Sequence, residues 1–385
     1  MREVTDEFSV SRAKLAYIID STAAPICIIA PISSWAAAVS GYTSGDGFSL
    51  FLQTIPFNLY ALLTIVMVTY VIKKDFHIGT MKHHEIAAQN GDVHNGVNDY
   101  EEGEEMEVSD QGRVYDLLLP VFFLIISCIV GMLYTGGFFE GVSFITAFTN
   151  CDASRGLVLG SFFTLVFIFI LYLPRKIISY EDFAKCIPMG FKTMVPAMII
   201  LTLAWTLGDL VSDKLQAGVF VYNLMHGASI STAILPVCLF LVGTGLAFAT
   251  GTSWGTFGIL IPIATSIFPE GSQMLVIAIA SILAGAVCGD HISPISDTTI
   301  MASAGAQCNH VNHVTSQIPY AMLVAGACVV GYLVAGFTTN VVLTFVIAII
   351  ALFIFIFITK YFYNFKCKEG LNVLFLYTLF YNYIK

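Results

Sequence analysis

The chain has 385 residues, of which 57% are hydrophobic and only 11% charged, and its mean hydropathy is +0.82. These values exclude an ordinary soluble globular domain and predict an integral membrane protein. The formal net charge of −9 says little about the membrane-embedded part, because ten of the 26 acidic residues lie between Asp75 and Asp110.

Apolar stretches of about 20 residues recur along the chain, as helices that cross a roughly 30 Å hydrocarbon core require. A porin-type barrel would instead show alternating ten-residue segments, which this sequence lacks. The predicted fold class is an all-α polytopic membrane protein with broken helices, since two long segments carry Pro or Gly in their middle. We predict nine transmembrane or re-entrant helical segments, at residues 14–40, 49–72, 115–134, 156–174, 192–208, 232–268, 272–304, 317–336 and 339–359.

Residues 75–114 form a polar, acidic stretch between the second and third segments. It is too poor in apolar residues to bury a core, so we expect a flexible loop. Lys and Arg cluster before the first segment, in this loop and after the fourth segment, which places all three on the cytoplasmic side. If successive segments alternate in direction to the end of the chain, Lys360, Lys366 and Lys368 lie outside. Either a later segment is re-entrant or the rule fails at the tail.

The sequence contains a weak internal repeat. STAAPICIIAPISS at 21–34 aligns with TSWGTFGILIPIAT at 252–265, and TIPFNLYAL at 54–62 aligns more faintly with SPISDTTIM at 293–301, with Pro56 matching Pro294. The copies at 21–34 and 252–265 lie five predicted segments apart and therefore face opposite ways. Inverted repeats of this kind build secondary transporters, whose broken helices form the binding site near the midplane.

The repeat divides the chain into five parts. We expect a partial first repeat at 1–74, the acidic cytoplasmic loop at 75–114, helices that complete the first repeat at 115–190, the second inverted repeat at 191–360, and an atypical tail at 361–385. The segment at 192–208 finds no repeat partner upstream of residue 1, so we expect a shortened or incomplete copy.

The sequence GDHISPISDTTIMASAGA at 289–306 provides the first candidate centre. Ionisable side chains inside a membrane span are costly and therefore indicate function. We rank Asp297 first, because Pro294 disrupts the helix and should leave the carbonyls near 288–291 available to a ligand. Hard oxygen ligands suit sodium, which we expect at the Asp297 region. Alternatively, Asp297 caps a half-helix that begins at Thr298, and both roles can hold together. The remaining oxygen-bearing residues of this centre are Asp290, Ser293, Ser296, Thr298 and Thr299.

The sequence IIDSTAAPICIIAPISSW provides the second centre, headed by Asp20 with the hydroxyls of Ser21 and Thr22. Its alternative role is an interfacial partner for the cations Arg12 and Lys14. In the matching half of the repeat, Gly251 replaces Asp20, while Thr252 and Ser253 keep the hydroxyls. We therefore expect an asymmetric cation and proton site.

Several further polar residues are possible accessories to this site. His291 could relay protons or be a hydrogen-bonded structural residue. Asn58 and Tyr60 could contact the ligand or only bond between helices. Glu140, Asn150 and Asp152 lie in a segment that is either an extracytoplasmic loop or dips back into the protein.

Other classes of protein fit poorly. A metalloprotease H-E-x-x-H motif fails, because the fifth position after His84-Glu85 is Ala88. The motif pair of an intramembrane aspartyl protease is incomplete, and there is no Walker-type loop or repeated channel filter. The nine cysteines show no zinc-type spacing. We therefore expect no enzyme, no catalytic residue and no cofactor.

The motifs quoted above, with IPFNLYAL and the Asn150-Cys151-Asp152-Ala153 neighbourhood, resemble the NhaC-type sodium/proton antiporter family in order from about residue 11 to 340. The resemblance implies an inverted-repeat exchanger of sodium for protons in the bacterial cytoplasmic membrane. Members of this family also exchange organic anions such as malate and lactate with sodium, and some are suspected of carrying amino acids. The chain departs from the family in lacking several initial helices and in its tail.

We therefore predict a multi-pass secondary transporter whose partners are sodium, protons and the lipid bilayer, with no nucleic acid. The alternative is a sodium-coupled exchanger of a small carboxylate or amino acid, which adds an organic solute. A further alternative is an inactive truncated remnant. A homo-oligomer is left open.

Overall fold

The structure of the chain is a computed structural model that describes residues 2–30, 35, 47–96, 112–209, 214, 216 and 231–369. Within these residues every regular element is helical, so the predicted all-α polytopic class is confirmed. In the part of the chain that the structure describes, five helices are long and apolar enough to span a membrane, and the bent pair Ser49–Phe57 and Leu59–Lys74 makes a sixth candidate. The five are α8 (Val114–Thr135), the Arg155–Tyr172 part of α10 (Ala153–Tyr172), α15 (Gln273–Ile292), α17 (His310–Thr338) and α18 (Val341–Glu369), whose spanning part ends at Tyr361.

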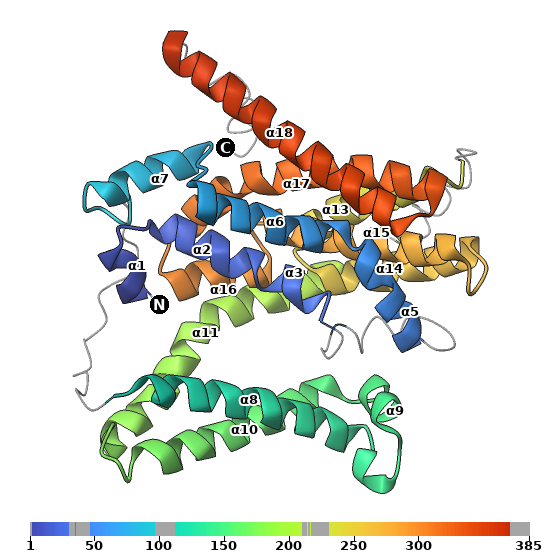
Figure 1. The fold of residues 1–385 in the computed structure, drawn as a ribbon. Coiled ribbons are helices and arrows are strands. Elements are labelled where there is room, and N and C mark those ends of the chain that lie inside the picture. The colour runs from blue at the N-terminus through green and yellow to red at the C-terminus, as the bar shows by residue number, and fades with distance from the viewer. Residues whose placement is uncertain are drawn as a thin grey trace.

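Helix α15 is the centre of the helical bundle (Figure 1), and every residue from Leu275 to Ile292 is buried. The helices α6 (Leu59–Lys74), α13 (Leu235–Thr250), α14 (Ser253–Ile267) and α17 pack around it. Two glycines allow the approach of α13. A Cβ built on Gly285 would lie 2.3 Å from the Phe240 carbonyl oxygen, and one on Gly289 would lie 2.2 Å from that of Thr244. Small residues at such contacts are how helices pack closely in a membrane.

The second half of the chain contains both helix breaks that we expected. Helices α13 and α14 are separated by Gly251, whose φ of +66° favours glycine, and by Thr252. Helix α15 ends at Ile292, and α16 (Asp297–Ala306) begins after a four-residue interruption that contains Pro294. Backbone groups freed at such depth must find partners inside the protein.

The first half contains breaks at matching positions. Helices α2 (Arg12–Ser21) and α3 (Ala24–Cys27) are separated by two residues, and α5 (Gly47–Thr54) meets α6 through the 3-10 helix η1 (Ile55–Phe57) at a 47° bend. Asn58 precedes α6 two residues after Pro56, just as Ser296 precedes α16 two residues after Pro294. The inverted repeat itself stays a prediction, and Pro31 of the alignment lies outside the described residues.

The Tyr332 side chain satisfies backbone groups at the break between η1 and α6. The Tyr332 hydroxyl donates to the Phe57 carbonyl at 2.9 Å and accepts from the Leu59 amide at 3.3 Å. At the break between α15 and α16, the Ser293 hydroxyl donates to the Phe248 carbonyl at 2.8 Å. The interruptions are therefore held in place by neighbouring helices, as buried polar backbone requires.

The stretch that we expected to be a flexible loop, 75–114, differs in the structure, because residues Thr80–Gln89 form helix α7. This helix packs against α2 and α17. Its buried residues Met81, His84, Glu85 and Ala88 follow the i, i+3, i+4, i+7 spacing of one helix face. Only two residues of this face are apolar, so the composition of the stretch did not indicate a packed helix. Residues 97–111 lie outside the described part.

Helices α8 and α10 form a separate pair below the bundle in Figure 1, connected to it by α11 (Tyr180–Asp209). They meet through glycines, since a Cβ on Gly131 would lie 2.4 Å from the Gly156 carbonyl oxygen. The short elements η2 (Phe138–Glu140) and α9 (Phe144–Thr149) connect them, and α1 (Arg2–Glu7) precedes α2. Of the predicted tail at 361–385, residues 361–369 continue α18 and the rest lie outside the described residues.

Candidate functional site

Two clusters of buried polar residues lie at the end of α15. The first, the Asp20 cluster, consists of Asp20, Ser21, Tyr60, His291, His313 and Gln317, contributed by α2, α6, α15 and α17. The second, the Asp290 cluster, consists of Asp290, Ser253 and Thr299 from α15, α14 and α16. Because Asp290 and His291 are neighbours in the sequence, the two clusters are adjacent. Helix α16 also packs against α2, which brings the two predicted centres together.

Asp20 is fully buried, and its Oδ2 accepts hydrogen bonds from α17. Gln317 Nε2 donates to it at 2.8 Å, and His313 Nε2 lies 3.3 Å away. Arg12 instead pairs with Asp6 at 2.5 Å, and Lys14 pairs with Asp75 and Glu85. The alternative role of Asp20, as an interfacial partner for these two cations, is therefore wrong.

His291 connects three helices through its ring and its backbone. Its Nε2 lies 3.1 Å from the Ser21 hydroxyl, and its Nδ1 lies 2.7 Å from the Tyr60 hydroxyl. Its carbonyl accepts a hydrogen bond from Gln317 Nε2. The direction of the two ring bonds depends on the tautomer, so the imidazole can pass a proton between α2 and α6 or simply tie them together.

Asp290 is 2% exposed and is held by hydroxyl groups from both sides. Ser253 Oγ, in the first turn of α14, donates to its Oδ2 at 2.9 Å. Thr299 Oγ1 lies 3.5 Å from its carbonyl oxygen. That carbonyl also accepts from the Ser293 amide at 3.0 Å, and the His291 carbonyl has its partner in Gln317. Two of the carbonyls that we expected to be free near Pro294 are therefore occupied, because buried carbonyls need partners.

Asp297, which we ranked first from the sequence, is half-buried and is the first residue of α16. Its Oδ1 accepts from the amide of Thr298 at 2.8 Å. The N-cap position belongs to Ser296, so the capping alternative is shifted by one residue. The hydroxyls of Ser296 and Thr298 bond to each other at 3.0 Å. Asp290 is thus the more deeply buried carboxylate of this centre.

Three other predicted residues lie at the ends of their helices. Thr22 is exposed, and its hydroxyl donates to the Ile18 carbonyl at 2.6 Å. Asn58 caps α6 through the Ala61 amide at 3.3 Å, and Thr252 is the buried N-cap residue of α14.

The three accessory residues Glu140, Asn150 and Asp152 are not brought to the clusters. They are exposed at the α9 end of the α8 and α10 pair (Figure 1). Asp152 there caps α10 and pairs with Arg155 at 3.1 Å. The structure favours the loop alternative for this segment.

Sequence reasoning missed His313 and Gln317. The predicted span began at 317, whereas the helix begins at His310, so His313 fell outside the predicted span and Gln317 lay only at its first position. The signal was available, because the two residues are four apart and share a helix face. The same first turn contributes His310, whose Nε2 lies 2.6 Å from the Pro294 carbonyl.

Replacing Gln317 by leucine is expected to reduce about tenfold the sodium-dependent transport that the sequence predicts. The change removes the donor shared by Asp20 and the His291 carbonyl, and a hydrogen bond to a charged group contributes about 1.5–3 kcal/mol. Initial rates at subsaturating sodium in membrane vesicles measure the effect. Thr315→Ala is the matched control on the same helix, since that hydroxyl donates to the Val311 carbonyl of its own helix at 2.8 Å. Equal rates for Gln317→Leu and the parent would contradict the assignment.

Comparison with known proteins gives a consistent picture. A family model described as the Na+/H+ antiporter family matches residues 4–337. An uncharacterized protein of Haemophilus influenzae is 39% identical over 377 residues, covering 93% of this chain and 70% of the relative. The malate-2H(+)/Na(+)-lactate antiporter of Bacillus subtilis is 29% identical over 228 residues, covering 57% of this chain and 46% of the relative.

A third relative, an uncharacterized Na(+)/H(+) antiporter of Haemophilus influenzae, is 29% identical over 136 residues and covers 35% of this chain. The chain spans 28% of that relative, and therefore less than half of either relative named as an antiporter. No solved structure matches the chain.

Proposed function

Because the chain belongs to the Na+/H+ antiporter family, we propose that it exchanges sodium ions for protons at the Asp20 and Asp290 clusters. The sequence-based recognition of the family is confirmed by the match over 4–337. The particular residues are our assignment.

The observation that carries the proposal is a set of buried, unpaired oxygens that belong to residues of the two clusters. Asp20 Oδ1, Asp290 Oδ1 and Gln317 Oε1 have no hydrogen-bond partner among the described residues. Buried acceptors are costly unless they bind a donor or a cation. Carboxylate, amide and hydroxyl oxygens are hard ligands that suit sodium. A proton on either carboxylate would satisfy the same oxygens, so sodium and a proton compete for one place.

The broken helices supply the second requirement, a site reachable from either side in turn. In many secondary transporters, two opposed repeats carry helix breaks at matching positions. One repeat then moves against the other around a fixed site at the breaks. Competition for the carboxylates combined with such alternating access gives exchange, and no catalytic group is needed.

The test is sodium-driven proton movement in everted membrane vesicles from cells that express the chain. We expect added sodium to dissipate a respiratory pH gradient, as reported by a fluorescent probe, while choline at the same concentration does not. Vesicles without the chain provide the background. A sodium response no greater than that background contradicts the proposal and favours the alternative of an inactive remnant.

A second candidate function is sodium-coupled exchange of a small carboxylate. It is favoured by the likeness to the Bacillus subtilis protein named as a malate and lactate antiporter. Helix N-termini at the breaks, such as that of α14, carry partial positive charge that attracts a carboxylate. The vesicle assay discriminates the two functions, since this one requires malate or lactate in addition to sodium.

The location of exchange follows from the same reasoning. The apolar helices and the family make the chain a multi-pass membrane protein. We place it in the bacterial cytoplasmic membrane, where sodium and proton gradients are maintained, and the relatives named above come from two bacteria.

A further inference from the structure

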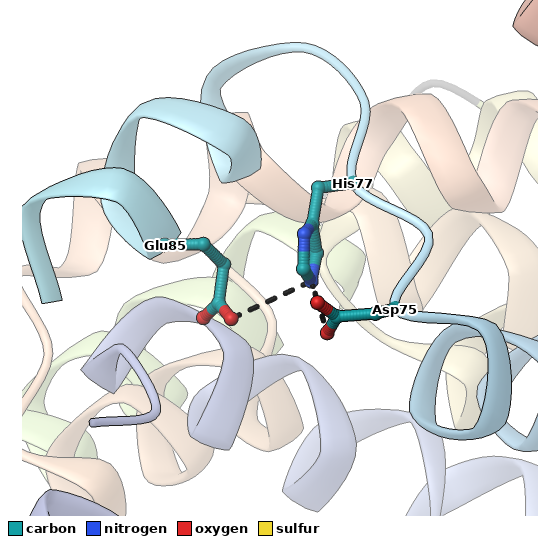
Figure 2. A group of neighbouring side chains, drawn as sticks. All are labelled: Asp75, His77 and Glu85. Atoms are coloured by element: carbon teal, nitrogen blue, oxygen red, sulfur yellow. Dashed lines mark ion pairs between the residues drawn. The ribbon is translucent and has the colours of Figure 1, made fainter. Parts of the chain in front are cut away.

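A second group of ligand-type side chains lies where α6 is connected to α7, outside the two clusters described above. Asp75 Oδ1, His77 Nε2 and Glu85 Oε2 all lie within 4.8 Å of one another. Figure 2 shows the three side chains converging from the connection and from α7. The distance from His77 Nε2 is 3.2 Å to Asp75 Oδ1 and 3.4 Å to Glu85 Oε2. We call these three residues the Asp75 triad.

The triad is held in place by surrounding residues. Glu85 Oε1 accepts from the Ser11 amide at 3.0 Å and from its hydroxyl at 2.6 Å, which leaves Oε2 directed toward His77. Tyr320 fixes the backbone on both sides of His77. Its hydroxyl donates to the Phe76 carbonyl at 3.0 Å and accepts from the Ile78 amide at 3.0 Å. The arrangement is therefore built before any ligand arrives.

The spacing of the triad suits a small divalent ion. Zinc bound at about 2.0–2.1 Å in tetrahedral geometry separates its ligand atoms by about 3.4 Å, and it accepts nitrogen and carboxylate ligands. Two of the three spacings, 3.2 Å and 3.4 Å, lie close to that value, and the third, between Asp75 Oδ1 and Glu85 Oε2, is within 4.8 Å.

The ammonium of Lys14 already contacts the Asp75 triad. Lys14 Nζ, from α2, lies 3.0 Å from Asp75 Oδ1, 3.1 Å from His77 Nε2 and 3.1 Å from Glu85 Oε2. One ammonium thus contacts all three ligand atoms at once. Its side chain is 9% exposed, whereas that of Asp75 is 68% exposed, so the triad opens to the surface on the Asp75 side.

We propose that Asp75, His77 and Glu85 bind a divalent transition-metal ion of the zinc class, in competition with the ammonium of Lys14. The ion would take the three ligand atoms and a water molecule, and it would displace Lys14 because two cations cannot share the same contacts. The site is distinct from the sodium site, so its test needs no transport measurement and can fail or succeed independently of the proposed function.

The test uses the full chain purified in detergent without a histidine tag, with zinc alone as the probe. Competition with a chromophoric chelator measures affinity and stoichiometry. We expect His77→Ala to lose about one bound zinc per chain relative to the parent. We expect Lys14→Met to bind zinc at least about tenfold more tightly, because the competing charge is gone. Lys74→Met, which removes an exposed lysine at the end of α6, is the matched control and should leave binding unchanged.

Thermal unfolding separates a metal site from a simple ion-pair cluster. Without zinc, Lys14→Met should unfold at a lower temperature than the parent. The substitution removes the ammonium that pairs with the buried Glu85 carboxylate. Zinc should restore the loss. Zinc binding that is equal in the parent and His77→Ala overturns the proposal, and so does a Lys14→Met protein that zinc neither binds more tightly nor stabilises. If Lys14→Met does not fold, the comparison of the parent with His77→Ala still decides.

Discussion

Replacing Asp290 by asparagine is expected to abolish sodium-dependent proton movement in vesicles. Asparagine keeps the shape of the side chain and its bond from Ser253, but it loses both the negative charge that holds a cation and the capacity to take up a proton. Removing one partner of a buried charge pair costs about 3–5 kcal/mol, which is a loss in sodium affinity of more than a hundredfold. The measurement is the initial rate of sodium-induced dissipation of the pH gradient.

Two further aspartates make the experiment discriminating. Asp152→Asn changes the exposed N-cap residue of α10, which is not part of either cluster, so it should transport like the parent. Asp297→Asn should be less severe than Asp290→Asn, because Asp297 is half-buried and its Oδ1 is engaged by the amide of Thr298. A severe loss in Asp297→Asn together with normal transport in Asp290→Asn would reverse the assignment and restore the ranking made from sequence.

The second large effect is expected from Gly285→Ala, which adds a single methyl group between α15 and α13. The added carbon would lie 2.3 Å from the Phe240 carbonyl oxygen, so the two helices must move apart. Overpacking a tight core costs about 1–3 kcal/mol and occasionally more. We expect a lower yield of monodisperse protein in detergent and a lower midpoint of thermal unfolding.

Gly245→Ala is the matched control, because Gly245 lies on α13, the helix that packs against Gly285, and a Cβ there would meet nothing within 4 Å. Alanine favours a helix over glycine by about 0.5–1 kcal/mol, so this variant should be as stable as the parent or slightly more stable. If both substitutions behave alike, the close contact of α13 with α15 is not what stabilises the bundle.

The sequence was most informative about the interruptions of the helices. Pro294 and Gly251 act locally, one by removing a donor and the other by adopting a positive φ, so the breaks beside them could be predicted without a structure. The match of Pro56 with Pro294 located the third break for the same reason. The amphipathic face of α7 was also encoded locally, but its two apolar residues did not stand out in an acidic stretch.

The partners of the buried carboxylates could not be predicted in this way. Asp20 and His313 are 293 positions apart, and Asp20 and Gln317 are 297 apart, so only the packing of α2 against α17 brings them together. Local pattern ranked Asp297 above Asp290, because Asp297 follows the break at Pro294 and stands among hydroxyl residues. What separates them is burial between helices, which depends on the whole bundle.

The complete enclosure of α15 also limits how the protein can move. A helix with neighbours on every side cannot slide or turn without exposing its surface, whereas the peripheral helices have a free face toward the lipid. Opening toward one compartment and then the other would therefore displace helices with an exposed face, such as α6 and α17, around a stationary α15. His291 lies on α15, so its ring contact with Tyr60 on α6 and its carbonyl contact with Gln317 on α17 are the ones that such a movement would change.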